Sequence, residues 1–185
     1  MTLRYAGVLP YAFDEYGEVW LLLGQERECR NAHTSRRWSD FGGMLDNDPP
    51  MHAAAREAYE ESMGLLGGPG DLIKHISHRE SIRGAHGQGV HYCLEMQLDR
   101  TLPIIFERFY RYACDSAERS RAELPGASAG MWEKIAMEWI PLRTIEKSCA
   151  LRREFAKDLP GVYAYFNDMV ERRERTAAGA QRSNR

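Results

Sequence analysis

The segment from Asp48 to Gly64 carries the strongest helix signal in the chain and limits what the rest can form around it. Asp48-Pro49-Pro50 is typical of a helix start, with Asp as the N-cap and Pro in the first turn. The helix is predicted to run to about Met63 and to end at Gly64, because glycine readily adopts the left-handed conformation that terminates helices. One side of this helix is small or apolar enough to pack: Met51, Ala55, Ala58, Tyr59 and Ser62.

Three acids lie on the other side of the same helix. At about 100° per residue, Glu57, Glu60 and Glu61 fall within an arc of about 100°. Each pair of like charges destabilises an isolated helix by roughly 0.2–0.5 kcal/mol. A divalent ion that prefers oxygen ligands, such as Mg²⁺ or Mn²⁺, removes this repulsion. The alternative is a glutamate-rich helix face that is simply exposed to solvent.

The flanking segments read as a mixture of strands and helices. Two apolar runs, residues 3–13 and 18–25, surround the turn-like Asp14-Glu15-Tyr16-Gly17 and predict a hairpin. The order of elements indicates one mixed α/β domain. Further strands are predicted over residues 72–83, 89–99 and 135–142, and further helices over 103–121 and 160–173.

Length and composition narrow the class of protein. The 185 residues suffice for one domain with a sizeable core, which we place at residues 1–175, followed by a flexible tail at 176–185. The chain is 43% apolar and 28% charged, with a net charge of −2, which is typical of a globular protein that does not bind nucleic acid by bulk charge. No apolar run approaches the roughly 20 residues of a membrane span, so no membrane partner is expected. Four cysteines without a C-x-x-C pair favour reduced thiols and a cytoplasmic location.

The histidines give no convincing zinc site. His75 and His78 lie three residues apart in a predicted strand, where such positions face opposite sides, so they cannot easily share a metal with His91.

The segment Gly42–Leu65 resembles the Nudix box of the Nudix hydrolase family. The box ends in Arg-Glu-U-x-Glu-Glu-x-Gly-U, where U is bulky and apolar, and Arg56, Glu57, Glu60 and Glu61 fall in register with it. The resemblance implies a Nudix-type α/β/α sandwich with a mixed central sheet. In outline it covers roughly residues 4–145, although only the box is highly specific.

The resemblance also implies roles for the box residues. Glu60 and Glu61 match the acids that bind divalent metal in this family, and Glu57 matches the acid that positions or deprotonates the attacking water or contacts metal. Arg56 matches the arginine that orients the acids by ion pairing. A backbone carbonyl in the Gly-Gly region, here at Gly42, often completes the metal shell.

This sequence departs from the box at its ends. The first glutamate of the box is replaced by Asp48, and Met63 stands where glycine is expected, with Gly64 one residue later. Ala58 is small for a bulky position. The metal-binding acids are intact, which favours an active enzyme over a degenerate copy.

A second resemblance lies downstream. Residues 137–142 resemble a late strand of the family that reads Glu-Trp-apolar-Pro-Leu, and several members carry another acid shortly before this Trp. Glu133 lies at that offset from Trp139 and is predicted as an additional metal ligand or base. A simple surface acid is the alternative.

Substrate contacts are predicted in the basic loop before the glycines. Arg27 and Arg37 suit phosphates, and Trp38 suits stacking on a base or packing in the core. The helix near 103–122 is predicted as an insertion that covers the pocket or forms a homodimer face. The predicted function is divalent-metal-dependent hydrolysis of a diphosphate linkage in a nucleoside diphosphate derivative. The alternatives are an RNA decapping enzyme, which would have capped RNA as partner, and a non-catalytic binding module.

Overall fold

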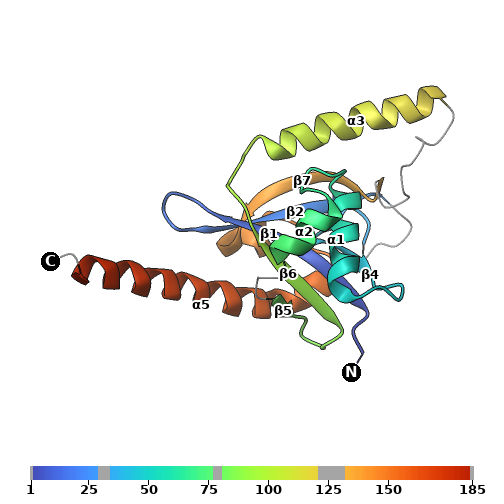
Figure 1. Ribbon diagram of the computed structural model, residues 1–185. Helices are drawn as coiled ribbons and strands as arrows, with labels where there is room; N and C mark the ends of the chain where they lie inside the picture. The colour runs from blue at the N-terminus through green and yellow to red at the C-terminus, as the bar shows by residue number, and fades with distance from the viewer. Residues whose placement is uncertain (1, 29–33, 77–80, 121–131, 184–185) are drawn as a thin grey trace.

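The computed structural model describes residues 2–28, 34–76, 81–120 and 132–183 (Figure 1). Within these ranges the strands form one seven-stranded sheet in the order β3-β2-β1-β6-β5, with β4 paired to β1 and β7 paired to β2. β1 and β6 run parallel, whereas the other pairs are antiparallel, so the predicted mixed central sheet is confirmed. The strands are β1 (Tyr5–Phe13), β2 (Val19–Glu26), β3 (Trp38–Ser39), β4 (Phe41–Met44), β5 (Ser81–Arg83), β6 (Gly89–Glu95) and β7 (Lys134–Pro141).

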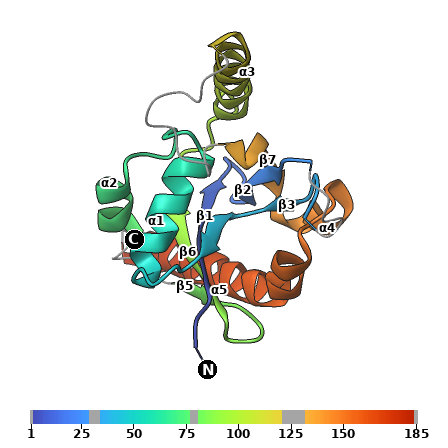
Figure 2. The same ribbon diagram turned by 90° about the vertical axis from the view of Figure 1, so that its right-hand side faces the viewer.

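Helices cover both faces of this sheet (Figure 2). Alternate residues of a strand face opposite sides. Accordingly, Ala6 and Val8 of β1 join the core beneath α1 (Pro50–Glu61) and α2 (Pro69–Ile76). Leu9 and Tyr11 join a second core on the other face, beneath α5 (Arg153–Ser183). The predicted α/β/α layering is confirmed. A short 3₁₀ helix, η2 (Leu142–Thr144), and α4 (Ile145–Ser148) connect β7 to α5.

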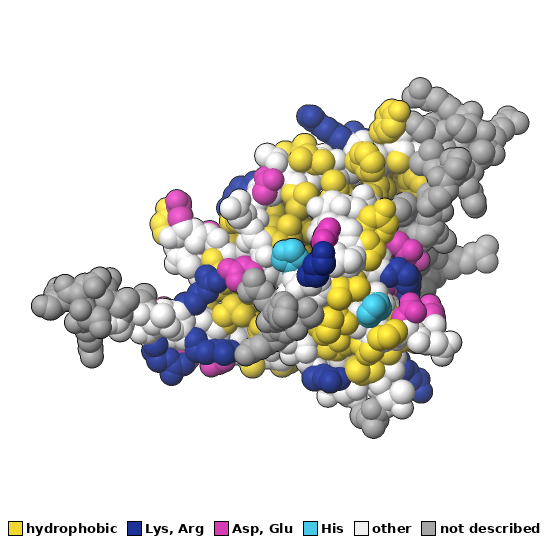
Figure 3. Space-filling model, in the orientation of Figure 1, with side chains coloured by type: hydrophobic (Ala, Val, Ile, Leu, Met, Phe, Trp, Pro, Cys, Tyr) yellow, Lys and Arg dark blue, Asp and Glu magenta, His cyan; other side chains and the backbone are white. Residues whose placement is uncertain are grey.

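The helix predicted over residues 103–121 is present as α3 (Leu102–Ser120), which packs against β7. Leu102, Phe106 and Ala113 are its buried contacts, so only part of its aromatic stripe lies in the core. Hydrophobic side chains are visible on the surface around α3 in Figure 3. The large exposed apolar residues of this helix are Ile104, Ile105, Phe109 and Tyr112. Among the described residues, no helix has the length and apolar character that crossing a membrane requires.

Several element predictions need correction. Residues 72–76 were expected to open a strand but belong to α2, because Leu72 and Ile76 are spaced by one helical turn and both are buried. The last helix begins at Arg153 rather than 160 and passes through Pro160. It also continues to Ser183 within the expected tail, whose flexibility stays a prediction.

The start of α1 differs by one residue from its prediction. Pro49 occupies the N-cap position without a side-chain hydrogen bond, and Pro50 lies in the first turn as expected. Asp48 is therefore not the cap. Its carboxylate instead lies 3.4 Å from Nε of Arg56, so the acid contacts the basic residue of the helix.

Candidate metal and phosphate site

The inner side of α1 brings two of the three predicted acids against the sheet. Ala54, Ala55 and Ala58 are fully buried, and their small side chains let the helix lie close to β1 and β4. Glu57 and Glu61 share this inner surface, with exposed fractions of only 8% and 1%. The alternative of a solvated glutamate face is therefore wrong for these two acids.

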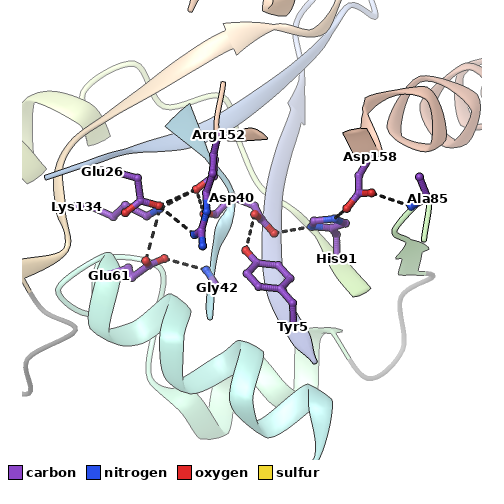
Figure 4. Close-up of polar contacts among 11 residues, drawn as sticks. Tyr5, Glu26, Asp40, Gly42, Glu61, Ala85, His91, Lys134, Arg152 and Asp158 are labelled. Atoms are coloured by element: carbon purple, nitrogen blue, oxygen red, sulfur yellow. Dashed lines mark hydrogen bonds and ion pairs between the residues drawn. The ribbon is translucent and has the colours of Figure 1, made fainter. Parts of the chain in front are cut away.

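Two glycines of β4 receive these carboxylates. The backbone N–H of Gly42 donates a hydrogen bond of 2.8 Å to Oε2 of Glu61 (Figure 4). A Cβ on Gly43 would lie 2.6 Å from the carboxyl carbon of Glu57, and a Cβ on Gly42 would lie 2.3 Å from the Cα of Gly7. The glycine pair is thus required by close approach of α1 on one side and of β1 on the other.

Arg56 links the remaining acid to the cluster. Its Nη1 lies 2.9 Å from Oε1 of Glu57 and 3.3 Å from Oε2 of Glu60. Glu60 is half-buried, so it lies at the border between the helix and solvent. This geometry is compatible with the orienting role that the resemblance implies for Arg56.

Glu133 lies directly before β7, the strand that pairs with β2. Its backbone carbonyl accepts a hydrogen bond of 2.7 Å from the N–H of Arg27. Its side chain is exposed but interacts electrostatically with Glu57, Glu60 and Glu61. The structure therefore brings all four predicted acids into one electrostatic cluster.

The pKa values of this cluster reflect burial and mutual repulsion. Burial raises the pKa of Glu57 and Glu61, and partial desolvation raises the pKa of the more exposed Glu133. Neighbouring carboxylates raise the pKa of each acid further. Nearby basic groups oppose the rise without cancelling it: Arg56 at Glu57, and Lys134 at Glu61. Such a cluster gains stability from any added cation, whether a proton or a metal ion.

Two residues of this cluster were missed by sequence reasoning: Glu26, at the end of β2, and Lys134, at the start of β7. The Nζ of Lys134 lies 2.7 Å from Oε1 of Glu26, 2.8 Å from Oγ of Ser39 and 3.5 Å from Oε1 of Glu61. Burial alone would lower the pKa of Lys134, but Glu61 and Glu26 hold it above its ordinary value. The ammonium is therefore charged. An available signal was the charged pair Glu133-Lys134 directly before an apolar strand.

The cluster continues across the sheet through a second polar network. Nη1 of Arg152 lies 3.3 Å from Oε1 of Glu26, and its Nε is buried without a hydrogen-bond partner among the described residues. Further along, His91 lies between two carboxylates, 2.6 Å from Asp40 and 2.9 Å from Asp158 (Figure 4).

This second network borders a cavity of about 300 Å³ between β1, β6 and the start of α5. Arg152, Tyr5 and Phe155 are among the residues that line it. The cavity and its network were not predicted. The available signal is the polar pair Ser39-Asp40 between Trp38 and Phe41, and the sequence indicates no role for His91 beyond a poor zinc ligand. His75 lies on α2, so the strand argument used for it does not apply.

The predicted substrate residues are dispersed. Arg27 is exposed beside Glu133, at the rim of the acid cluster. Trp38 is half-buried and packs against the core beneath α5. Of its two predicted roles, this contact agrees with packing in the core. Arg37 is half-buried, and its backbone joins the 34–37 turn and β2. The central part of the basic loop, residues 29–33, lies outside the described residues.

The oxygen atoms of this cluster are of the chemical type that binds divalent cations. Buried carboxylates and a backbone carbonyl are the hard oxygen ligands that Mg²⁺ and Mn²⁺ prefer. In the present arrangement, no three His, Cys, Asp or Glu side chains within the described part of the chain converge on one point at metal-binding distance. Glu57 and Glu60 instead share Arg56, so binding an ion requires their side chains to turn from that guanidinium. Within the described residues, Cys93, Cys114 and Cys149 form no disulfide bond, in line with the prediction of reduced thiols.

Among known proteins, similarity is found to solved structures. No protein-family model matches the sequence, and no curated protein matches it. The chain is similar to the Nudix hydrolase RenU from M. smegmatis, with 13% identity, a TM-score of 0.47 and coverage of 90% of this chain and 87% of that chain. A C. elegans Ap4A hydrolase gives 17% identity, a TM-score of 0.47 and coverage of 90% and 98%. The NUDIX domain of Shewanella oneidensis NrtR, solved with ADP ribose, gives 12% identity, a TM-score of 0.48 and coverage of 89% and 88%.

Proposed function

We propose that this chain is a Nudix-type hydrolase that splits a diphosphate linkage in a nucleoside diphosphate derivative, with Mg²⁺ or Mn²⁺ as cofactor. One observation carries the proposal: Glu57 and Glu61 project from one side of α1, buried, onto the glycine pair of β4. Glu60 and Glu133 lie in the same electrostatic cluster. The negative charge of a diphosphate repels nucleophiles. A divalent ion bound by this acid cluster would neutralise that charge.

The residues of the cluster have different proposed roles in hydrolysis. Glu57, Glu60, Glu61 and Glu133, with the carbonyl of Gly42, are the groups proposed to hold metal. When bound, a divalent ion neutralises phosphate oxygens and lowers the pKa of water. Glu57 also suits the general base that takes the proton of the attacking water, because its raised pKa makes it a better proton acceptor than an ordinary carboxylate. Arg56 orients Glu57 and Glu60 by ion pairing.

Substrate phosphates are proposed to reach the cluster from its basic rim. Arg27 lies beside Glu133, and Arg37 lies at the end of the loop between β2 and β3. A guanidinium binds phosphate oxygens through paired N–H donors, which favours a diphosphate over a neutral ligand. Trp38 remains a proposed contact only through its exposed part.

A substrate panel tests this proposal. Nucleoside triphosphates, nucleotide sugars, ADP-ribose, dinucleoside polyphosphates and capped RNA are incubated with Mg²⁺ and with Mn²⁺, and products are separated by chromatography. At least one diphosphate is expected to be cleaved, with activity abolished by EDTA. Glu57→Gln is expected to lower the rate by roughly 100-fold or more, the usual range for loss of a general base. Glu146→Gln, on the exposed surface of α4, is the matched control and keeps the wild-type rate. No product from any substrate with either metal overturns the proposal.

A specific observation favours a second candidate, a binding module without turnover. Arg56 and Lys134 already neutralise Glu57, Glu60 and Glu61 in part, so the cluster holds its own counterions. Binding of ADP-ribose or a nucleoside diphosphate in EDTA, measured by calorimetry and with no product formed, identifies this function.

A further inference from the structure

Lys134 is a lysine in a position that lysine rarely occupies. Its side chain has an exposed fraction of 0%. The aliphatic stem crosses β2 at Gly24, where a Cβ would lie 2.9 Å from Cδ of Lys134. Any side chain at residue 24 would collide with the stem. A buried ammonium is strongly destabilising unless charged or polar partners surround it, so its partners must be built into the fold.

The ammonium has such partners from three separate strands and helices. Glu26 comes from β2 and Glu61 from α1 (Figure 4). Ser39 comes from β3, and all three lie at the distances given above. Arg152 and Ser39 also contact Oε1 of Glu26, at 3.3 and 3.2 Å. A single cation therefore joins two acids that belong to different layers of the protein.

Glu61 differs from Glu57 in what surrounds its carboxylate. One oxygen of Glu61 accepts the N–H of Gly42 and the other faces the ammonium of Lys134. Both oxygens thus have positively polarised partners from the protein. Glu57, by contrast, is paired with Arg56, whose side chain is 35% exposed and can move aside into solvent.

We propose that the ammonium of Lys134 is a built-in cation of the acid cluster, which takes the place of a metal ion between Glu26 and Glu61. It lies 3.5 Å from Oε1 of Glu61 and keeps divalent metal with the four proposed ligands, Glu57, Glu60, Glu61 and Glu133, and out of the gap beside Glu26. The inference deepens the proposed function and rests on it only for the identity of those metal ligands. Its own claim is that removing the ammonium creates a further cation site.

The chemistry of the two cations supports such an exchange. The ammonium of Lys134 contacts both Glu26 and Glu61, whereas the guanidinium of Arg152 contacts Glu26 alone. Removing the ammonium leaves Glu61 without that cation, and a divalent ion can replace it. Mg²⁺ binds oxygen at roughly 2.0–2.1 Å and usually keeps several waters. Removal of the lysine stem leaves room for these waters beside Gly24. A purely structural ion pair predicts only loss of stability, with no change in the number of bound ions.

Counting bound manganese in Lys134→Ala tests the inference. Free Mn²⁺ is measured by electron paramagnetic resonance during titration, and melting temperatures are recorded with and without Mn²⁺. Lys134→Ala is expected to bind one more Mn²⁺ per chain than the wild type, and its melting temperature is expected to rise further with Mn²⁺. Lys147→Ala, an exposed lysine of α4, is the matched control and keeps the wild-type number of ions.

A second variant separates the added site from a general effect of charge. Lys134→Ala combined with Glu26→Gln removes one acid together with the ammonium, and it is expected to bind the same number of ions as the wild type. A folded Lys134→Ala with an unchanged number of ions overturns the inference. Because the count is a difference between variants, it stays decisive even if the wild type binds no ion, a result that would contradict the proposed function alone.

A crystal of the wild-type chain grown with Mn²⁺ decides the case if Lys134→Ala does not fold. Anomalous scattering is expected near Glu57, Glu60 and Glu133, with the ammonium still hydrogen-bonded to Glu26. Manganese density bound to both Glu26 and Glu61, with Lys134 displaced, overturns the inference. Absence of manganese from the gap between Glu26 and Glu61, with Lys134 in it, supports the claim that the ammonium holds that position.

Discussion

At the scale of single residues, the candidate site depends on two glycines, whose lack of a side chain leaves room for their neighbours. Gly43 lacks a side chain where the carboxylate of Glu57 lies, and Gly42 lacks one where β1 passes. The two glycines have different neighbours, however. Gly42 faces backbone atoms, which cannot move cheaply, whereas Gly43 faces the end of a flexible side chain. Substitution at Gly43 can therefore disturb the chemistry while leaving the fold intact.

Gly43→Ala is expected to lower hydrolysis of the best substrate by roughly 100-fold, because displacing a reacting group by about 1 Å has effects of that size. Its Cβ would lie 2.6 Å from Oε1 of Glu57, so that carboxylate must turn away. The unfolding midpoint in urea should change little, since only the end of Glu57 moves. Steady-state rates and urea unfolding measure the two effects. Gly179→Ala, with no neighbour within 4 Å, is the control. Wild-type rates in Gly43→Ala would show that Glu57 does not act from its observed position.

At the scale of elements, the end of α1 explains one departure from the Nudix box. Met63 stands where the box has glycine, and its φ is +53°, while the following Gly64 has a φ of +78°. The left-handed region costs an ordinary residue roughly 1–2 kcal/mol, which is why glycine is favoured there. α1 ends at Glu61, and two left-handed residues follow its cap Ser62. The N–H of Gly64 donates a hydrogen bond to the carbonyl of Tyr59.

Gly64→Ala is expected to destabilise the protein by about 1 kcal/mol, because alanine at positive φ is strained. Its Cβ would also lie 3.1 Å from the Tyr59 ring. Urea denaturation followed by circular dichroism measures the change. Gly70→Ala is the matched control: it lies within α2, has open space around it, and should stabilise by roughly 0.5–1 kcal/mol. Equal midpoints for Gly64→Ala and the wild type would contradict the strain at the end of α1.

Local signals predicted the elements better than the contacts between them. α1 was predictable because its prolines and alanines act within a few residues, although it ends at Glu61, before the predicted end at Met63. Residues 72–76 were mistaken for a strand because a short apolar run has no unambiguous period. The Glu26–Lys134 pair, 108 residues apart, was invisible because it forms only when β7 lies beside β2. The four acids predicted from the box and the late strand lie near enough to interact electrostatically, whereas no sequence motif marks the network around His91.

At the scale of the whole molecule, polar contacts cross the sheet from one helical layer to the other. They run from Glu61 of α1 through Lys134 and Glu26 to Arg152, which interacts electrostatically with Asp40. From Asp40 they continue through His91 to Asp158 of α5. The two layers are therefore joined by buried charges as well as by the apolar cores. Their stability should depend on the charge of the one histidine in this path.

Stability is expected to fall as pH rises from about 6.5 to about 10. Burial alone would lower the pKa of His91, but Asp40 and Asp158 raise it from 6.5 to about 10. A group whose pKa is raised by folding contributes its full stability below its unfolded pKa and loses it as pH approaches the folded pKa. The side chains of Tyr5 and Phe155 are the aromatic groups that face the imidazole.

Asp158→Asn tests the origin of this pH dependence. The asparagine keeps an acceptor for the N–H of Ala85, which Asp158 binds at 2.7 Å, but removes one of the two charges on His91. The pKa of His91 should fall, so the variant should lose less stability than the wild type between pH 6.5 and 10. Free energies of unfolding in urea across this range give the slopes, and nuclear magnetic resonance of the imidazole gives the pKa directly. Asp168→Asn, an exposed acid of the same helix, should keep the wild-type slope. Identical slopes in Asp158→Asn and the wild type would mean that the buried imidazolium does not join the two layers.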